Sequence, residues 1–117
     1  MPFREQHQSP DGSFRLLVIR DSGDITVGFD GYPWHTHGEV IAGELTLAGW
    51  PSTTPEDAVR RFVEDLIRGR IPLTVVRAGG EIRDVWASYL PQSDDPSRPD
   101  DEVLEFRRWD GGRWPPN

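Results

Sequence analysis

The sequence predicts an α+β fold, with an antiparallel sheet of about five strands and one long amphipathic helix on one face (ββ-α-βββ order). Apolar residues recur at helical spacing from Pro55 to Arg68, and strand-like alternation with turn residues lies on both sides. A helix with one apolar face needs a covering layer, which a sheet supplies. The 117 residues are expected to form a single domain, 1–117. Residues 1–11 are expected to be a flexible lead-in and residues 91–101 a mobile loop.

A β-hairpin is predicted before the helix. Phe14–Ile19 is rich in β-branched and aromatic residues, and Ile25–Phe29 alternates apolar residues with Thr26 and Gly28. Residues 21–24 between them have turn chemistry, with a glycine that is free to adopt a positive φ. The two runs therefore pair as antiparallel strands.

Residues 38–50 carry competing signals. Glu44–Leu47 alternates as a strand does, whereas the glycines of the stretch disfavour a strand. The sequence does not settle the structure of this segment.

The helix itself has clear start and stop signals. Thr54 can cap it, Pro55 suits its first position, and Asp57 stands where a capping box has Glu or Gln. Gly69 fits the position after the last turn. The apolar stripe comprises Ala58, Val59, Phe62, Val63, Leu66 and Ile67.

Three strands are predicted after the helix, at Leu73–Ala78, Glu81–Tyr89 and Glu102–Trp109. The first two form a hairpin around the glycine pair at 79–80. Trp86 has the same strand parity as Ile82, so we expect both side chains on the core face.

Charge and composition exclude several classes of protein. The formal net charge is −7, which disfavours binding to a phosphate backbone. A charge of this size is most often a matter of ordinary solubility, and the sharper interpretation is a basic protein partner. There is no cysteine, so disulfide scaffolds and thiol nucleophiles are excluded. No apolar run reaches the roughly 20 residues that span a bilayer. We expect a cytoplasmic protein that binds neither nucleic acid nor membrane.

The segment that follows the first hairpin concentrates aromatic, imidazole and carboxylate groups. Tyr32, Trp34, His35, His37 and Glu39 lie within eight residues at the end of a predicted strand. Exposed groups at strand ends commonly form sites, and aromatic residues are enriched in binding hot spots. We therefore expect these five residues to form a binding surface, the alternative for the loop aromatics Tyr32 and Trp34 being that they cover the edge of the core.

The same segment allows a metal site. His35 and His37 are two apart, so an extended backbone would direct both imidazoles to one side. Asp30, Glu39 or His7 could add a third ligand for a divalent metal such as zinc, leaving an open position for water. In the other interpretation the histidines bond to loop backbone or form a contact surface, and the protein needs no cofactor.

The chain resembles small uncharacterised bacterial proteins grouped with the immunity proteins of polymorphic toxin systems. The resemblance rests on the amphipathic helix, the acidic balance and a core motif of Gly28, Phe29, Tyr32, Trp34, His35 and His37. Pro33 and the stretch from Gly38 to Gly49 depart from the pattern. The resemblance implies a domain that binds and blocks a cognate toxin and catalyses nothing.

The sequence is thus compatible with two functions, and also with a homodimer. A non-enzymatic protein-binding domain fits the absence of a Gly-x-Ser-x-Gly nucleophile motif and of a glycine-rich phosphate loop before the helix. A small metal-dependent hydrolase that uses the His-x-His pair is the alternative. A homodimer that buries a strand edge or a tryptophan surface is a further possibility.

Overall fold

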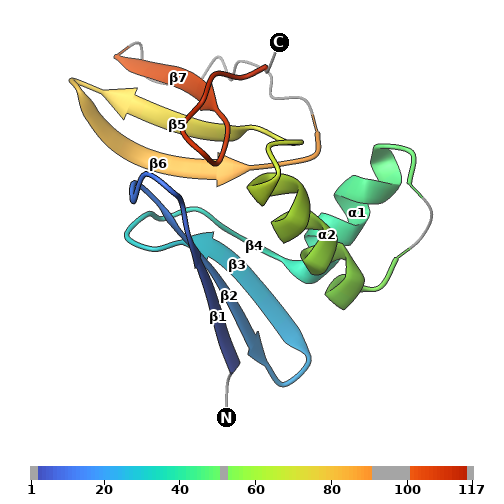
Figure 1. The fold of residues 1–117 in the computed structure, drawn as a ribbon. Helices are drawn as coiled ribbons and strands as arrows, with labels where there is room; N and C mark the ends of the chain where they lie inside the picture. Colours follow the sequence, from blue (N-terminus) through green and yellow to red (C-terminus); the bar gives the residue numbers. More distant parts are fainter. Residues whose placement is uncertain (1–2, 51–52, 91–100, 116–117) are drawn as a thin grey trace.

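The computed structural model describes residues 3–50, 53–90 and 101–115. It is an α+β structure with two antiparallel sheets and two helices, rather than the single sheet and single helix expected. The two sheets lie one over the other, and both helices lie together at one end of the pair (Figure 1). Among the described residues, no helix combines the length and the apolar character needed to cross a membrane.

The first sheet contains the predicted N-terminal hairpin. Its strands pair in chain order and are β1 (Phe3–Gln8), β2 (Arg15–Asp21), β3 (Asp24–Phe29) and β4 (His35–His37). Every neighbouring pair is antiparallel. The part of the chain expected to be a flexible lead-in thus contains an edge strand, because its backbone pairs with β2.

The second sheet has the predicted strands in the order β6-β5-β7. They are β5 (Leu73–Ala78), β6 (Glu81–Ala87) and β7 (Glu102–Arg107). Residues 91–100 of the expected mobile loop lie outside the described residues.

Helix α2 (Pro55–Ile67) confirms the helix prediction. The Thr54 hydroxyl accepts a hydrogen bond from the backbone N–H of Asp57 at 3.2 Å, as an N-cap should. Gly69 has a φ of +73°, the left-handed conformation that ends many helices.

Helix α1 (Gly38–Leu47) replaces the strand that alternation suggested at 44–47. Its buried residues include Ile41 and Leu45, which are one helical turn apart and share a face. A Cβ at Gly38 would lie 3.0 Å from the Pro55 Cβ, so only glycine allows this close approach to α2. Tertiary packing therefore decides the conformation of the segment.

One apolar core joins both sheets to both helices. Its fully buried side chains are Leu16, Val18, Val27, Ile41, Leu45, Val59, Phe62, Leu66, Leu73, Val75 and Val85.

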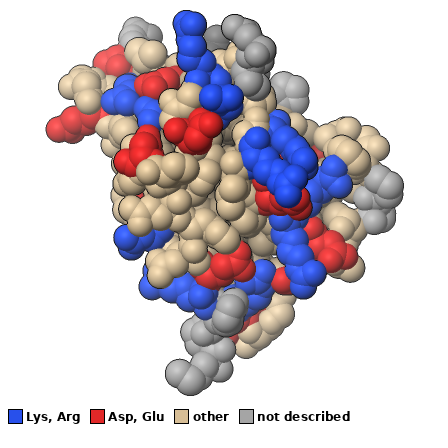
Figure 2. Space-filling view, viewed as in Figure 1, with Lys and Arg blue, Asp and Glu red and all other residues tan. Residues whose placement is uncertain are grey.

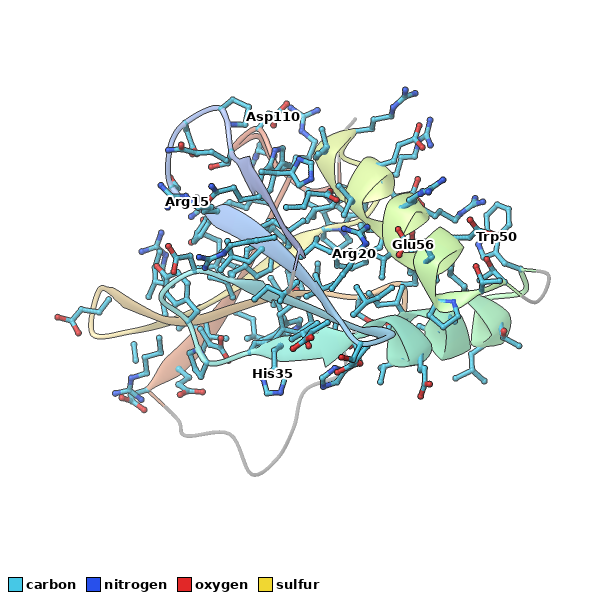
Figure 3. The ribbon with its side chains drawn as sticks, turned by 90° about the horizontal axis from the view of Figure 1, so that it is seen from below. Arg15, Arg20, His35, Trp50, Glu56 and Asp110 are labelled. Atoms are coloured by element: carbon cyan, nitrogen blue, oxygen red, sulfur yellow. The ribbon has the colours of Figure 1, made fainter. Side chains whose placement is uncertain are left out.

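The fold is also held by an ion-pair network. Arg20 on β2 donates to Glu56 at the start of α2 at 2.8 Å and to Glu5 on β1 at 3.0 Å. Figure 3 shows Arg20 and Glu56 facing each other between β2 and α2.

The prediction that Trp86 lies in the core is wrong. A register shift between Val76 and Arg77 places Ile82 opposite Arg77 but skips Arg83, so the parity of β6 changes along the strand. Ile82 packs against the core, whereas Trp86 is half-buried and is not part of the core.

Candidate binding surface

Strand β4 orients the two histidines. Val27 pairs with Thr36, which is buried, so the residues on either side of Thr36 point away from the core. His35 is exposed and projects from β4 in Figure 3. His37 keeps 42% of its side chain exposed, and the two imidazole centroids lie 5.5 Å apart with nearly perpendicular planes. The structure thus places both imidazoles on one side of the strand.

Each imidazole has a nearby polar group. His37 Nδ1 lies 3.4 Å from the Thr26 hydroxyl and 3.6 Å from an Asp24 carboxylate oxygen. His35 Nδ1 lies 3.4 Å from the carbonyl of Pro33. These separations are long for hydrogen bonds, so the rings have polar neighbours but are not tightly fixed.

Trp34 is anchored on both of its sides. Its ring packs on Phe29 with centroids 5.8 Å apart, and its backbone N–H donates to Asp84 of β6 at 3.1 Å. Gly28 faces His35 in the sheet, and a Cβ there would lie 3.0 Å from the Trp34 carbonyl oxygen. The lack of a side chain at Gly28 therefore permits the observed path of Trp34 and His35.

Two hollows lie beside β4 and share residues. One, of about 450 Å³, is lined by Trp34, His35, Thr36, His37, Val40, Glu44, Trp86, Ala87 and Ser88. The other, of about 500 Å³, is lined by Ser22, Gly23, Asp24, His37, Glu39 and Val40. Because both are lined by His37 and Val40, we treat them as one surface, the β4 trough.

Helix α1 contributes a fixed carboxylate to this trough. Glu44 Oε1 accepts from the Ser88 hydroxyl at 2.5 Å and from the Tyr89 backbone N–H at 3.0 Å. Burial, together with a hydrogen bond to Asp65, raises the pKa of Tyr89 far above its usual value, so its hydroxyl remains a donor. The end of β6 is thereby joined to both helices.

The predicted binding residues fall into two groups. Trp34, His35, His37 and Glu39 all line the β4 trough. Tyr32 does not, because its ring packs on Phe14 at a centroid distance of 6.0 Å and is partly buried against the core.

The predicted metal ligands are only partly brought together. Asp30 lies 3.5 Å from Arg15 and does not line the trough. His7 is on β1, at the opposite edge of the first sheet from β4. Within residues 3–50, 53–90 and 101–115, no three histidine or carboxylate side chains form a group that could hold a metal ion.

Several trough residues were not singled out by the sequence. Val40 and Glu44 lie in residues 38–50, whose conformation the sequence left open. The directions of their side chains follow only once this segment is known to be a helix. Asp24, Trp86 and Ser88 come from β3, β6 and the end of β6, and only the tertiary fold brings them to β4.

Comparison of the chain with protein-family models, with curated proteins and with solved structures finds no match. The resemblance to immunity proteins therefore remains a prediction.

Proposed function

We propose that this chain is a non-enzymatic protein-binding domain whose partner docks on the β4 trough, and that this partner is a toxin that the domain neutralises. The observation that carries the proposal is the juxtaposition of Trp34 with the exposed His35 and Val40 in one hollow beside β4. Val40 is 50% exposed although it is apolar. Apolar and aromatic groups rimmed by polar ones are typical of protein interaction sites.

The position of the trough also supports docking. It is formed by β4, α1, the end of β6 and the β2–β3 turn, and the first three of these are fixed by the core or by hydrogen bonds. A surface on rigid elements loses little conformational entropy when a partner binds, and this preserves affinity.

Binding to the protein encoded beside this gene tests the proposal. Isothermal titration calorimetry with the purified neighbour is expected to give a dissociation constant below 1 μM, a typical strength for a specific complex. Trp34→Ala and the exposed His35→Ala should each weaken binding, Trp34→Ala by about tenfold or more. Val103→Ala on β7 is the control, since Val103 is 62% exposed and does not line the trough.

His35→Ala is included because Trp34→Ala removes packing on Phe29 and could weaken binding by perturbing the fold. His35 is exposed, so its removal tests the surface itself. Circular dichroism of both variants checks this point. Absence of binding to any neighbour-encoded protein at micromolar concentration, or equal weakening by Val103→Ala, would contradict the proposal.

A metal-dependent hydrolase is the second candidate, and one observation favours it. His35 and His37 direct their rings to the same side with centroids 5.5 Å apart, and Glu39 lines a hollow with His37. The two imidazoles and the Glu39 carboxylate do not form a three-ligand group in the described residues, so they would have to draw together to hold a divalent ion such as zinc that activates water. Elemental analysis of untagged protein decides between the two functions. Less than about a tenth of an equivalent of metal argues against the hydrolase, because zinc sites with three ligands bind tightly.

A further inference from the structure

The β4 trough differs in charge from three other hollows formed by the described residues, which are lined by Arg70, Arg20 and Arg15 respectively. The Arg20 hollow adjoins the trough and shares Ser22, Gly23 and Asp24 with it, but Arg20 itself is paired with Glu5 and Glu56. No arginine lines either hollow of the β4 trough, which instead contains the carboxylates of Asp24, Glu39 and Glu44. The chain has no lysine, so within the described residues the trough walls carry acidic groups and no permanently cationic one.

These carboxylates also differ from most others in the structure. Many acidic side chains are neutralised by arginine, as in the pairs formed by Glu56, Asp65 and Glu105. Figure 2 shows this interleaving of arginine and acidic atoms over the region of α2. Asp24 and Glu39 form no ion pair with an arginine of the described residues, and both are exposed. Their negative charge therefore remains available to a partner.

An indole lies in the same trough. Trp34 packs one part of its ring on Phe29 and is only half-buried, so part of the indole lines the hollow next to His35. A cation held close to a tryptophan face gains about 0.5–1 kcal/mol or more from the ring quadrupole. Trp34 lines one hollow of the trough, Asp24 and Glu39 line the other, and His37 and Val40 line both. Asp24 has the His37 imidazole as a neighbour at 3.6 Å but no arginine partner in the part of the chain that the structure describes. The trough as a whole thus suits a cationic, partly apolar surface better than an anionic one.

We propose that the β4 trough receives lysine or arginine side chains of the protein partner, with Asp24 and Glu39 holding the charge and Trp34 contacting the apolar stem. This inference rests on the proposed function and specifies the chemistry of the partner's contact surface. Charge complementarity of this kind speeds association and rejects acidic surfaces.

A lysine peptide tests the inference without the natural partner. The probe is an N-acetylated, fluorescein-labelled decapeptide of alternating lysine and glycine, and fluorescence anisotropy in about 0.1 M salt measures binding, because the Debye length is then only about 10 Å. The double variant Asp24→Asn with Glu39→Gln should weaken binding at least about fivefold. The matched control is Asp57→Asn with Glu81→Gln, which removes the same charge from exposed positions outside the trough. It should weaken binding less than about twofold, as expected for distant screened charges.

A carbodiimide that joins carboxylates to amines provides an independent readout. Because the chain contains no lysine, lysine amines in the mixture come from the probe, and mass spectrometry locates the carboxylates that react. Adducts should concentrate on Asp24 and Glu39 over Asp57 and Glu81. Equal weakening by the two double variants, adducts spread evenly over exposed carboxylates, or no binding at millimolar peptide would overturn the inference.

The outcome separates this inference from the function proposed above. If a neighbour-encoded protein binds and His35→Ala weakens it while the Asp24 and Glu39 variant does not, the inference fails and the function stands. If the peptide binds through Asp24 and Glu39 but no neighbour-encoded protein binds, the function fails and the recognition chemistry stands.

Discussion

Helices α1 and α2 lie side by side, yet different causes make them helical. Helix α2 has a side-chain cap from Thr54, a proline at its start and a continuous apolar stripe. Helix α1 has no side-chain cap and begins at a glycine, Gly38, where an added Cβ would lie 3.0 Å from the Pro55 Cβ. Local sequence thus accounts for α2, whereas contact with the rest of the fold accounts for α1. The helix that borders the β4 trough is the one that depends on its surroundings.

Truncation of the α2 stripe should have the largest effect. Phe62 is 1% exposed and packs edge-on against Tyr89, so Phe62→Ala leaves a cavity. We expect a loss of about 3–5 kcal/mol in the free energy of unfolding, measured by urea denaturation. A loss below about 1 kcal/mol would mean that the core collapses around the site, and that α2 contributes less to stability than its burial implies.

Gly38→Ala should lower the free energy of unfolding, measured by urea denaturation, by about 1–3 kcal/mol. The new Cβ at the start of α1 would lie 3.0 Å from the Pro55 Cβ. Gly43→Ala is the matched control in the same helix, since a Cβ there meets nothing within 4 Å. This control should stabilise the protein by about 0.5–1 kcal/mol through helix propensity. If the two variants had equal free energies of unfolding, the dependence of α1 on its contact with α2 would be disproved.

Removal of the α2 cap should have a smaller effect. Thr54→Ala deletes the acceptor for the Asp57 N–H and should cost about 1 kcal/mol in the free energy of unfolding. Thermal unfolding followed at 222 nm measures it, and Thr54→Ser, which keeps the hydroxyl, should restore most of the loss. An unchanged melting temperature in Thr54→Ala would show that α2, like α1, is determined by packing.

The smallest effect concerns the ion pair that ties α2 to β2. Hydrogen bonds from Arg20 hold the pKa of Glu56 below its ordinary value. A lowered pKa contributes stability above the ordinary value near 4.5, and this contribution is lost as the pH falls through the folded-state pKa. Near pH 7 the free energy of unfolding of the wild type should exceed that of Arg20→Gln by under about 1 kcal/mol, because Glu56 is partly exposed.

The pH dependence of that difference is the measurement. Urea denaturation of both proteins at pH 7 and at pH 3 should give a difference that shrinks at the lower pH. A constant difference at the two pH values would assign the effect of Arg20 to packing of its aliphatic stem rather than to charge.

The contrast between the helices also explains which elements of the fold could be predicted from the sequence. Alternation and turn residues located β2, β3, β5, β6 and β7, because those signals act over a few neighbouring residues. The sequence did not predict helix α1, since Glu44–Leu47 alternates as a strand does. Only the contacts of Gly38, Ile41 and Leu45 make the segment helical. Trp86 was misplaced by a register shift that no local pattern announces.

The candidate site divides in the same way. The sequence identified His35 and His37 as a pair on one side of an extended segment, and the structure places them so. Tyr32 was grouped with them although it turns back onto Phe14. Asp24 and Glu44 share no local motif with the histidines, because they reach the trough from β3 and α1 only through the tertiary fold.

The hydrogen bond from the Trp34 N–H to Asp84 links the two sheets at the wall of the trough. A molecule seated there would touch both sheets at once and would bind only when they are correctly docked. Its binding energy would then oppose any opening between the sheets, by mass action. Amide protons of β4 and β6 would consequently exchange with solvent more slowly in the complex, and this slowing would be detectable before any partner contact is mapped.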